Sequence, residues 1–129
     1  MKPGTMARIT GDLKERTLRF GCGVLSVIRE LPAETTGWVV GKQLARSATS
    51  IGANVWEADA ALTDSDFAHR ISIARKEASE TQYWLEVVKR TELLPEGRCA
   101  ALFAEVDELV KILSTIVRRT QEHVHRAKD

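Results

Sequence analysis

Cysteine, proline and aromatic residues are all scarce in this 129-residue chain, and no long apolar run occurs in it. Two cysteines, Cys22 and Cys99, are too few for a disulfide framework, so we expect reduced thiols that pack as small, buried or half-buried hydrophobic groups. No apolar stretch approaches the ~18 residues of a membrane-spanning helix, and the first residues lack the apolar segment of a secretory signal. These absences argue against a membrane span and predict a cytoplasmic protein.

The composition that remains is typical of a helical domain. Apolar residues make up 43 % of the chain and charged residues 29 %, but aromatic residues only 5 %. Leu, Val and Ala must therefore fill most of the interior, as they do in helical bundles. The length favours a single domain over residues 1–129.

Apolar residues recur at alternating steps of four and three, which is the spacing of one face of an α-helix. The clearest seam is that of the third helical segment, formed by Phe67, Ile71, Ala74, Ala78, Thr81, Leu85 and Val88. Helices are predicted at about residues 12–31, 38–60, 64–91 and 96–125, preceded by a loose tail over residues 1–10. Short connections force neighbouring helices to run antiparallel. The sequence thus predicts an all-α, antiparallel up-down-up-down four-helix bundle.

The second helical segment carries small and polar residues among its apolar ones. Gly52 in a helix interior costs about 1 kcal/mol relative to Ala, so close approach of another backbone is the expected compensation, with a tolerated defect as the alternative. A polar stripe of Ser47, Ser50, Asn54 and Glu57 runs beside it, and Glu77 and Glu80 flank the seam of the next helix. We expect a hydrogen-bonded network between these two helices, with a solvated face as the alternative.

These two helices carry a specific residue pattern. Its members are Gln43, Arg46, Ser50, Asn54, Glu57, Glu77, Glu80 and Trp84. The pattern resembles that of the 23S ribosomal RNA intervening-sequence proteins, although many relatives have proline where Gly52 stands and others tyrosine where Trp56 stands. The resemblance implies an antiparallel four-helix bundle that assembles into a ring-shaped homopentamer. It supplies no established activity.

The same family is similar in architecture to the accessory variability proteins of diversity-generating retroelements. Those proteins are basic pentamers that bind a reverse transcriptase and its RNA. The resemblance thus makes RNA, or a nucleoprotein containing a reverse transcriptase, a candidate partner for this chain.

The fourth helical segment has two apolar rows, where packing inside a bundle requires one. The first row is Leu102, Val106, Leu109, Leu113 and Ile116. The second row repeats every seven residues and is our predicted oligomer interface: Phe103, Val110, Val117 and Val124. A monomer would leave it in water, where apolar patches of that size are unusual. The alternative is one wide core face.

Net charge is only +1, but basic residues concentrate in the first 19 and last 19 positions. Antiparallel helices bring both ends together, and phosphate contacts add electrostatically, so these bases form the candidate nucleic-acid site. They are Arg8, Lys14, Arg16, Arg19, Arg118, Arg119, Arg126 and Lys128. The turn at the same end carries four acids that could neutralise them: Glu57, Asp59, Asp64 and Asp66. The alternative function is a protein assembly module without nucleic-acid affinity.

Enzymatic chemistry has little support in the sequence. The pairs Glu122/His125 and Asp66/His69 have the spacing of di-metal bundle ligands, but both lie at helix ends, where water competes. No nucleophile signature and no glycine-rich phosphate loop occurs. We therefore expect no enzyme activity, no metal and no cofactor.

Overall fold

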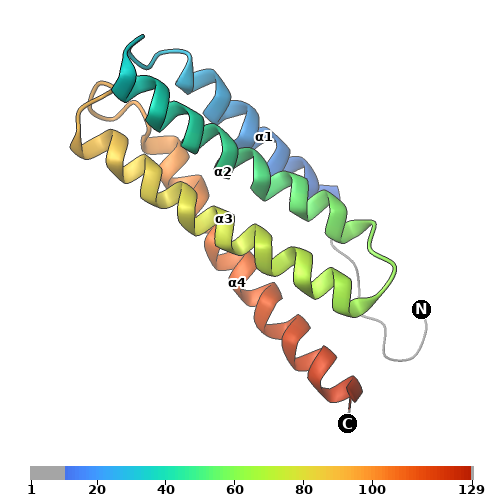
Figure 1. Ribbon diagram of the computed structural model, residues 1–129. Helices are drawn as coiled ribbons and strands as arrows, with labels where there is room; N and C mark the ends of the chain where they lie inside the picture. The colour runs from blue at the N-terminus through green and yellow to red at the C-terminus, as the bar shows by residue number, and fades with distance from the viewer. Residues whose placement is uncertain (1–10, 129) are drawn as a thin grey trace.

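The computed structural model describes residues 11–128, and side chains from residue 12 to residue 126. It contains four helices, α1 (Gly11–Ile28), α2 (Thr35–Asp59), α3 (Asp64–Arg90) and α4 (Ala100–Lys128). Successive helices run in opposite directions, and no strand occurs in the described part of the chain (Figure 1). The predicted all-α, antiparallel four-helix bundle is confirmed. The predicted tail over residues 1–10 lies outside the described residues.

Helix boundaries differ from the predicted ones next to the prolines. α1 stops at Ile28 and α2 already begins at Thr35, where Glu34 caps the helix and its carbonyl accepts a 2.9 Å bond from Trp38 N. α4 begins at Ala100, four residues later than predicted. A left-handed Gly97 (φ 80°) turns the chain between Pro95 and α4, so helical geometry starts only after it.

The predicted seams form the core. All seven seam residues of α3 are buried, as are Leu44, Ser47, Ile51, Val55 and Ala58 on α2. The largest fully buried side chain is that of Phe67 on α3, and Leu44 on α2 is fully buried as well. Regular spacing of apolar residues therefore placed the core correctly on both helices.

Gly52 lies against α1, where its backbone meets that of Thr17. A Cβ added at Gly52 would lie 3.3 Å from the Thr17 carbonyl carbon and oxygen. The expected close approach of another backbone is confirmed, and that backbone belongs to α1. Gly21 on α1 makes a looser contact of the same kind, 3.7 Å from Thr49 Cα. Small residues thus set the spacing between α1 and α2.

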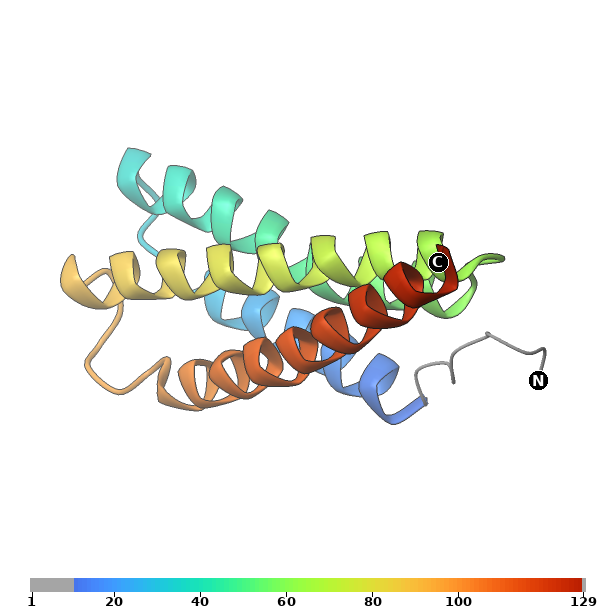
Figure 2. The ribbon, with the colours of Figure 1, turned by 90° about the horizontal axis from the view of Figure 1, so that it is seen from below.

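α4 crosses the other helices at an angle instead of lying parallel to them (Figure 2). The start of α1, the α2–α3 turn and the end of α4 all lie at one end of the molecule (Figure 1). The candidate nucleic-acid site requires this arrangement, because its bases come from both ends of the chain. None of the described helices is long and apolar enough to cross a membrane.

The two cysteines differ in their surroundings. Cys99 is buried at 8 % exposure, as expected, but Cys22 is exposed on α1. The expectation of two sheltered thiols is therefore wrong for Cys22, since α1 turns that side chain away from the core.

Candidate nucleic-acid interface

Arg46 on α2 links the middle of α2 to the middle of α3. Its guanidinium donates to Glu77 at 3.0 Å and also to Glu80, and its Nε donates to Gln43 Oε1 at 3.2 Å. Trp84 Nε1 donates to Glu80 at 3.0 Å. We call these five residues the Arg46 cluster. Spacings of three and four residues place its members on facing helix sides. A network thus joins the two helices through Glu77 and Glu80 as expected, but its centre is Arg46, which was not one of the predicted members.

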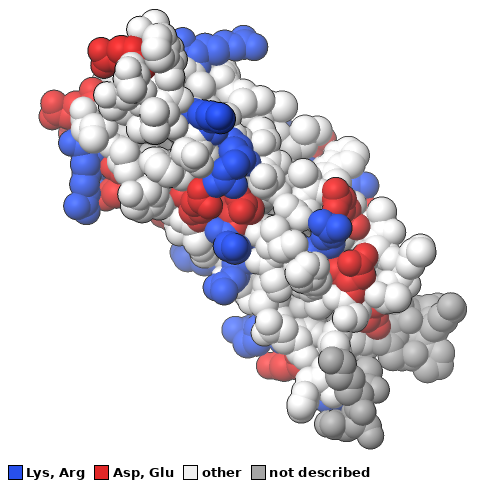
Figure 3. All heavy atoms as spheres, in the orientation of Figure 1, with Lys and Arg blue, Asp and Glu red and all other residues white. Residues whose placement is uncertain are grey.

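The Arg46 cluster lies at the border between core and solvent. The Glu77 side chain is only 12 % exposed, whereas that of Arg46 is 46 % exposed. Acidic and basic side chains are intermixed on the face formed by α2 and α3 (Figure 3). This face therefore offers no single-sign surface to an RNA backbone.

Three other motif residues bond elsewhere. Ser50 Oγ donates to the Arg46 carbonyl at 2.7 Å, and Asn54 Nδ2 donates to the Ser50 carbonyl at 2.8 Å. Glu57 pairs with Arg70 at 2.9 Å. The predicted joining of Ser50 and Asn54 to the α3 glutamates is wrong, because a short polar side chain in a helix readily bonds the carbonyl one turn back.

Two of the predicted RNA-binding bases form ion pairs with neighbouring helices of the bundle. Lys14 Nζ lies 3.2 Å from Asp59 on α2. Arg16 makes two 2.8 Å hydrogen bonds with Glu105 on α4, and these bonds raise the pKa of its guanidinium. Both cations fasten α1 to a neighbouring helix, so a phosphate would have to displace a carboxylate to reach them.

The remaining predicted bases differ in what the structure describes of them. Arg19 lies 3.5 Å from Glu15, one turn earlier on the exposed side of α1. Arg8 lies outside the described residues, as does the side chain of Lys128. The structure therefore assembles only part of the predicted basic end.

The outward side of α4 keeps its cations available. Lys111, Arg118, Arg119 and Arg126 are all exposed, and within the described side chains none of the four forms an ion pair. We call these four residues the α4 basic strip. Lys111 was not among the predicted site residues, although its place in the same helix as the three arginines could have indicated it. From Lys111 to Arg126 the strip spans about 22 Å of helix at 1.5 Å per residue.

Most of the acids at the α2–α3 turn have partners other than the strip. Three of them face other partners within the chain: Glu57 faces Arg70, Asp59 faces Lys14, and Asp64 lies 3.1 Å from His123. These contacts tie the α2–α3 turn to α1, α3 and α4. The acidic turn is thus engaged in holding the bundle together.

The candidate metal ligands stay apart. Over residues 12–126 no three His, Cys, Asp or Glu side chains approach closely enough to hold a metal ion. The Glu122/His125 and Asp66/His69 pairs accordingly do not converge on one site. His123, between the first pair, faces Asp64 instead.

The apolar row predicted as an oligomer interface is partly covered by its own chain. Val117 is buried at 8 % exposure, and Phe103, Val110 and Val124 are half-buried. Lys89 from α3 lies over the Phe103 ring at 5.7 Å. The row therefore fits the alternative of one wide core face, since α4 packs along α3. The most exposed large apolar side chains lie elsewhere, at Leu18, Leu25, Trp38, Val39, Trp56, Leu62 and Tyr83.

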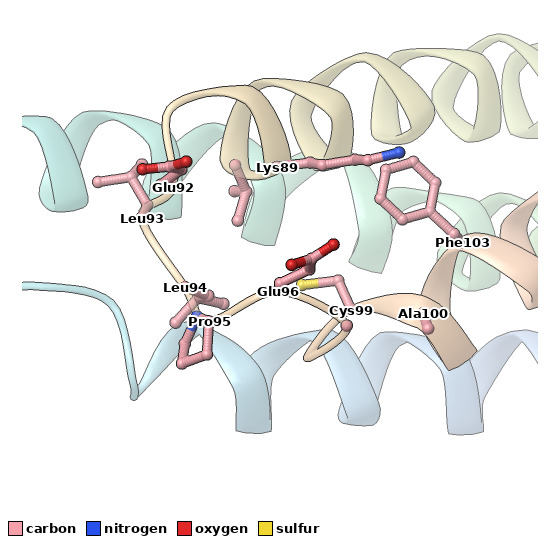
Figure 4. A pocket seen from close by; sticks show the side chains of 11 residues that line it. Lys89, Glu92, Leu93, Leu94, Pro95, Glu96, Cys99, Ala100 and Phe103 are labelled. Carbon is pink, nitrogen blue, oxygen red and sulfur yellow. The ribbon is translucent and has the colours of Figure 1, made fainter.

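A hollow of about 1070 Å³ lies at the opposite end, between the end of α3 and the start of α4. Lys89 extends toward Phe103 across it, with Glu96 and Cys99 on the opposite wall (Figure 4). Burial raises the pKa of the Cys99 thiol. A thiol that stays protonated is a poor nucleophile, so the hollow contains no activated cysteine.

The fold places this chain in the class of helical-bundle proteins. Its four long α-helices are antiparallel, charged groups bridge them, and the last helix carries a cationic strip. The family model of the 23S rRNA-intervening sequence protein matches residues 12–115. The chain belongs to that family, and the predicted resemblance is confirmed.

A solved structure supports the same assignment. It is the crystal structure of a protein of unknown function, from the S23 ribosomal protein family of Bacteroides thetaiotaomicron. The two chains are 38 % identical, the match covers 81 % of this chain and 96 % of that one, and the TM-score is 0.75. None of the curated proteins compared with this chain matches it.

Proposed function

We propose that this protein is a non-catalytic, homo-oligomeric helical scaffold that binds RNA, alone or within a nucleoprotein such as a reverse transcriptase complex. The α4 basic strip is the observation that carries the proposal. Its four cations have no carboxylate partner among the described side chains, so a phosphate backbone could take that place without breaking a contact of the bundle. The name of the family, which refers to 23S rRNA, is consistent with an RNA partner.

The expected assembly is a ring of five chains, as the family resemblance implies. One strip of four cations supplies only weak, salt-sensitive binding. Five copies on one ring would act together, because each further contact is intramolecular once the first has formed. The scaffold therefore derives its affinity from repetition, and we place it in the cytoplasm, where RNA is accessible.

Exposed apolar side chains favour a second candidate, a protein assembly module without nucleic-acid affinity. Trp38 is 64 % exposed, Val39 55 % and Tyr83 60 %. Aromatic residues on an open surface are frequent anchors of protein–protein contacts. In this case the partner would be a protein that covers α2 and α3, and the α4 basic strip would remain in solvent.

A gel-shift titration with a fluorescent 40-nucleotide RNA separates the two candidates. Four phosphate contacts per chain predict a slope of about −2.8 for log K against log salt, or a loss of about 50-fold between 50 and 200 mM salt. The variant Arg118→Glu/Arg119→Glu/Arg126→Glu removes three of the four contacts. It is expected to reduce the slope to about −0.7 and to weaken binding more than 100-fold at 50 mM salt.

The matched control carries the same charge change at exposed bases elsewhere. Lys42→Glu/Arg75→Glu/Lys76→Glu alters α2 and α3, whose three bases have no ion-pair partner among the described residues. Its RNA affinity should equal that of the natural chain. Equal binding by both triple variants, or no shift of the natural protein in 50 mM salt, would contradict the RNA proposal.

A further inference from the structure

α1 carries a second heptad seam on the side that faces away from the core. Glu15, Leu18, Cys22, Leu25 and Arg29 follow one another at steps of three, four, three and four. Leu18 is 45 % exposed, Leu25 is 42 % exposed, and Cys22 between them is exposed. We call these five residues the outer α1 seam. Such spacing is what one helix needs to pack against another along its length.

The neighbouring helices of the same chain do not cover this seam. Lys14 points to α2, where it meets Asp59, and Arg16 points to α4, where it meets Glu105. The outer α1 seam lies on the remaining side, opposite the buried residues of α1. Since none of the described helices of the same chain lies there, we expect a helix that packs against it to come from another copy.

The two ends of the seam carry side chains of opposite charge, Glu15 and Arg29, although Glu15 also lies 3.5 Å from Arg19 of its own chain in an exposed contact. Glu15 and Arg29 are 14 residues apart, or about 21 Å along the helix, so they cannot meet within one chain. A second α1 laid antiparallel across the first, with Cys22 against its own equivalent, would place each Glu15 beside Arg29 of the other copy. Leu18 would face Leu25 of the other copy. A parallel arrangement would instead oppose like charges at both ends.

We propose that the outer α1 seam is a twofold-symmetric interface between two copies of this chain. Each residue pair then occurs twice, as in any isologous contact. Trp56, 46 % exposed and bonded through its Nε1 to the Lys14 carbonyl, extends the apolar surface beside the seam. One helix pair lies at the small end of stable interfaces, which bury 1,200–2,000 Å², so the contact should depend on protein concentration.

This contact is independent of ring closure. Twofold contacts cannot close a ring of five chains, because such a ring uses two different surfaces on each copy. Where a ring forms, the outer α1 seam would join two rings. The inference thus stands whether or not the RNA proposal holds.

Thiol cross-linking tests the position of the axis. With a short bismaleimide at 10–200 µM protein, as an order-of-magnitude range around weak association, the natural chain should yield a covalent pair, detected by intact-mass spectrometry. Cys22→Ser should abolish the pair, and Cys99→Ser should leave it unchanged, since Cys99 is buried. Absence of the pair at every concentration, or its survival in Cys22→Ser, would overturn the proposal.

Charge exchange tests the pairing. Glu15→Lys and Arg29→Glu should each lower the yield of the Cys22-linked pair several-fold, because each puts like charges together across the axis. The double variant Glu15→Lys/Arg29→Glu restores opposite charges and should recover the yield. Single variants equal to the natural chain, or a double variant as weak as the singles, would contradict an antiparallel seam. Circular dichroism of each variant serves as the control for folding.

Native mass spectrometry and the RNA gel separate this inference from the proposed function. RNA binding without any Cys22-linked pair would refute the α1 interface alone. A Cys22-linked pair without RNA binding would refute the RNA scaffold alone.

Discussion

Replacing Arg46 by alanine tests whether the Arg46 cluster stabilises the bundle. The substitution leaves Glu80 with its bond from Trp84, but Glu77, only 12 % exposed, loses its ion-pair partner. A surface pair such as Arg46–Glu80 contributes about 0–1 kcal/mol. Loss of the charged hydrogen bond to the half-buried Glu77 adds about 1–2 kcal/mol. We expect Arg46→Ala to lower the free energy of unfolding by about 1–3 kcal/mol.

Urea unfolding followed by circular dichroism measures this loss at one fixed protein concentration, since assembly makes stability depend on concentration. Lys42→Ala is the matched control, because Lys42 is exposed on the same helix and has no ion-pair partner among the described residues. It should stay within about 0.5 kcal/mol of the natural chain. If Arg46→Ala were no less stable than Lys42→Ala, the cluster would have no structural role and the reasoning would fail.

Two further predictions concern close packing and pH. Gly37→Ala should destabilise the fold by about 2 kcal/mol or more, because its Cβ would lie 2.0 Å from the Pro32 carbonyl oxygen. Gly21→Ala meets only ordinary contacts and should be neutral or stabilising by up to about 1 kcal/mol. Thermal unfolding of the two variants compares these effects. Hydrogen bonds from Arg98 lower the pKa of Glu30, so their contribution is complete above the unfolded glutamate pKa of about 4.3 and is lost as the pH falls through the lower folded value. The stability difference between the natural chain and Arg98→Ala should therefore shrink between pH 6 and pH 3, and a difference that stays constant would contradict this assignment.

Much of the fold could be predicted from the spacing of apolar residues. Phe67, Ile71 and Leu85 lie on one helix face whatever surrounds them, because 3.6 residues per turn brings every third or fourth side chain to the same side. The same geometry brought Arg46 and Glu80 within reach of each other once two antiparallel helices were expected. Periodicity is local, so a single sequence can reveal it.

The candidate site was less predictable. Arg16 and Arg118 look alike in the sequence, yet one is bonded to Glu105 and the other is free of ion pairs among the described residues. Glu105 is 89 positions away from Arg16, and nothing local indicates that the two will meet. Only the structure could therefore show which of the predicted bases are paired and which belong to the α4 basic strip.

The sequence by itself determined four helices, their antiparallel order and the core seams of α2 and α3, because these follow from short-range periodicity and short connections. Only the tertiary structure decided how α4 crosses the bundle, and with it whether Val117 is covered, which cations stay available and which side of α1 remains open. The physical reason is that the angle between two helices depends on side chains from both, at contacts between residues far apart in the chain.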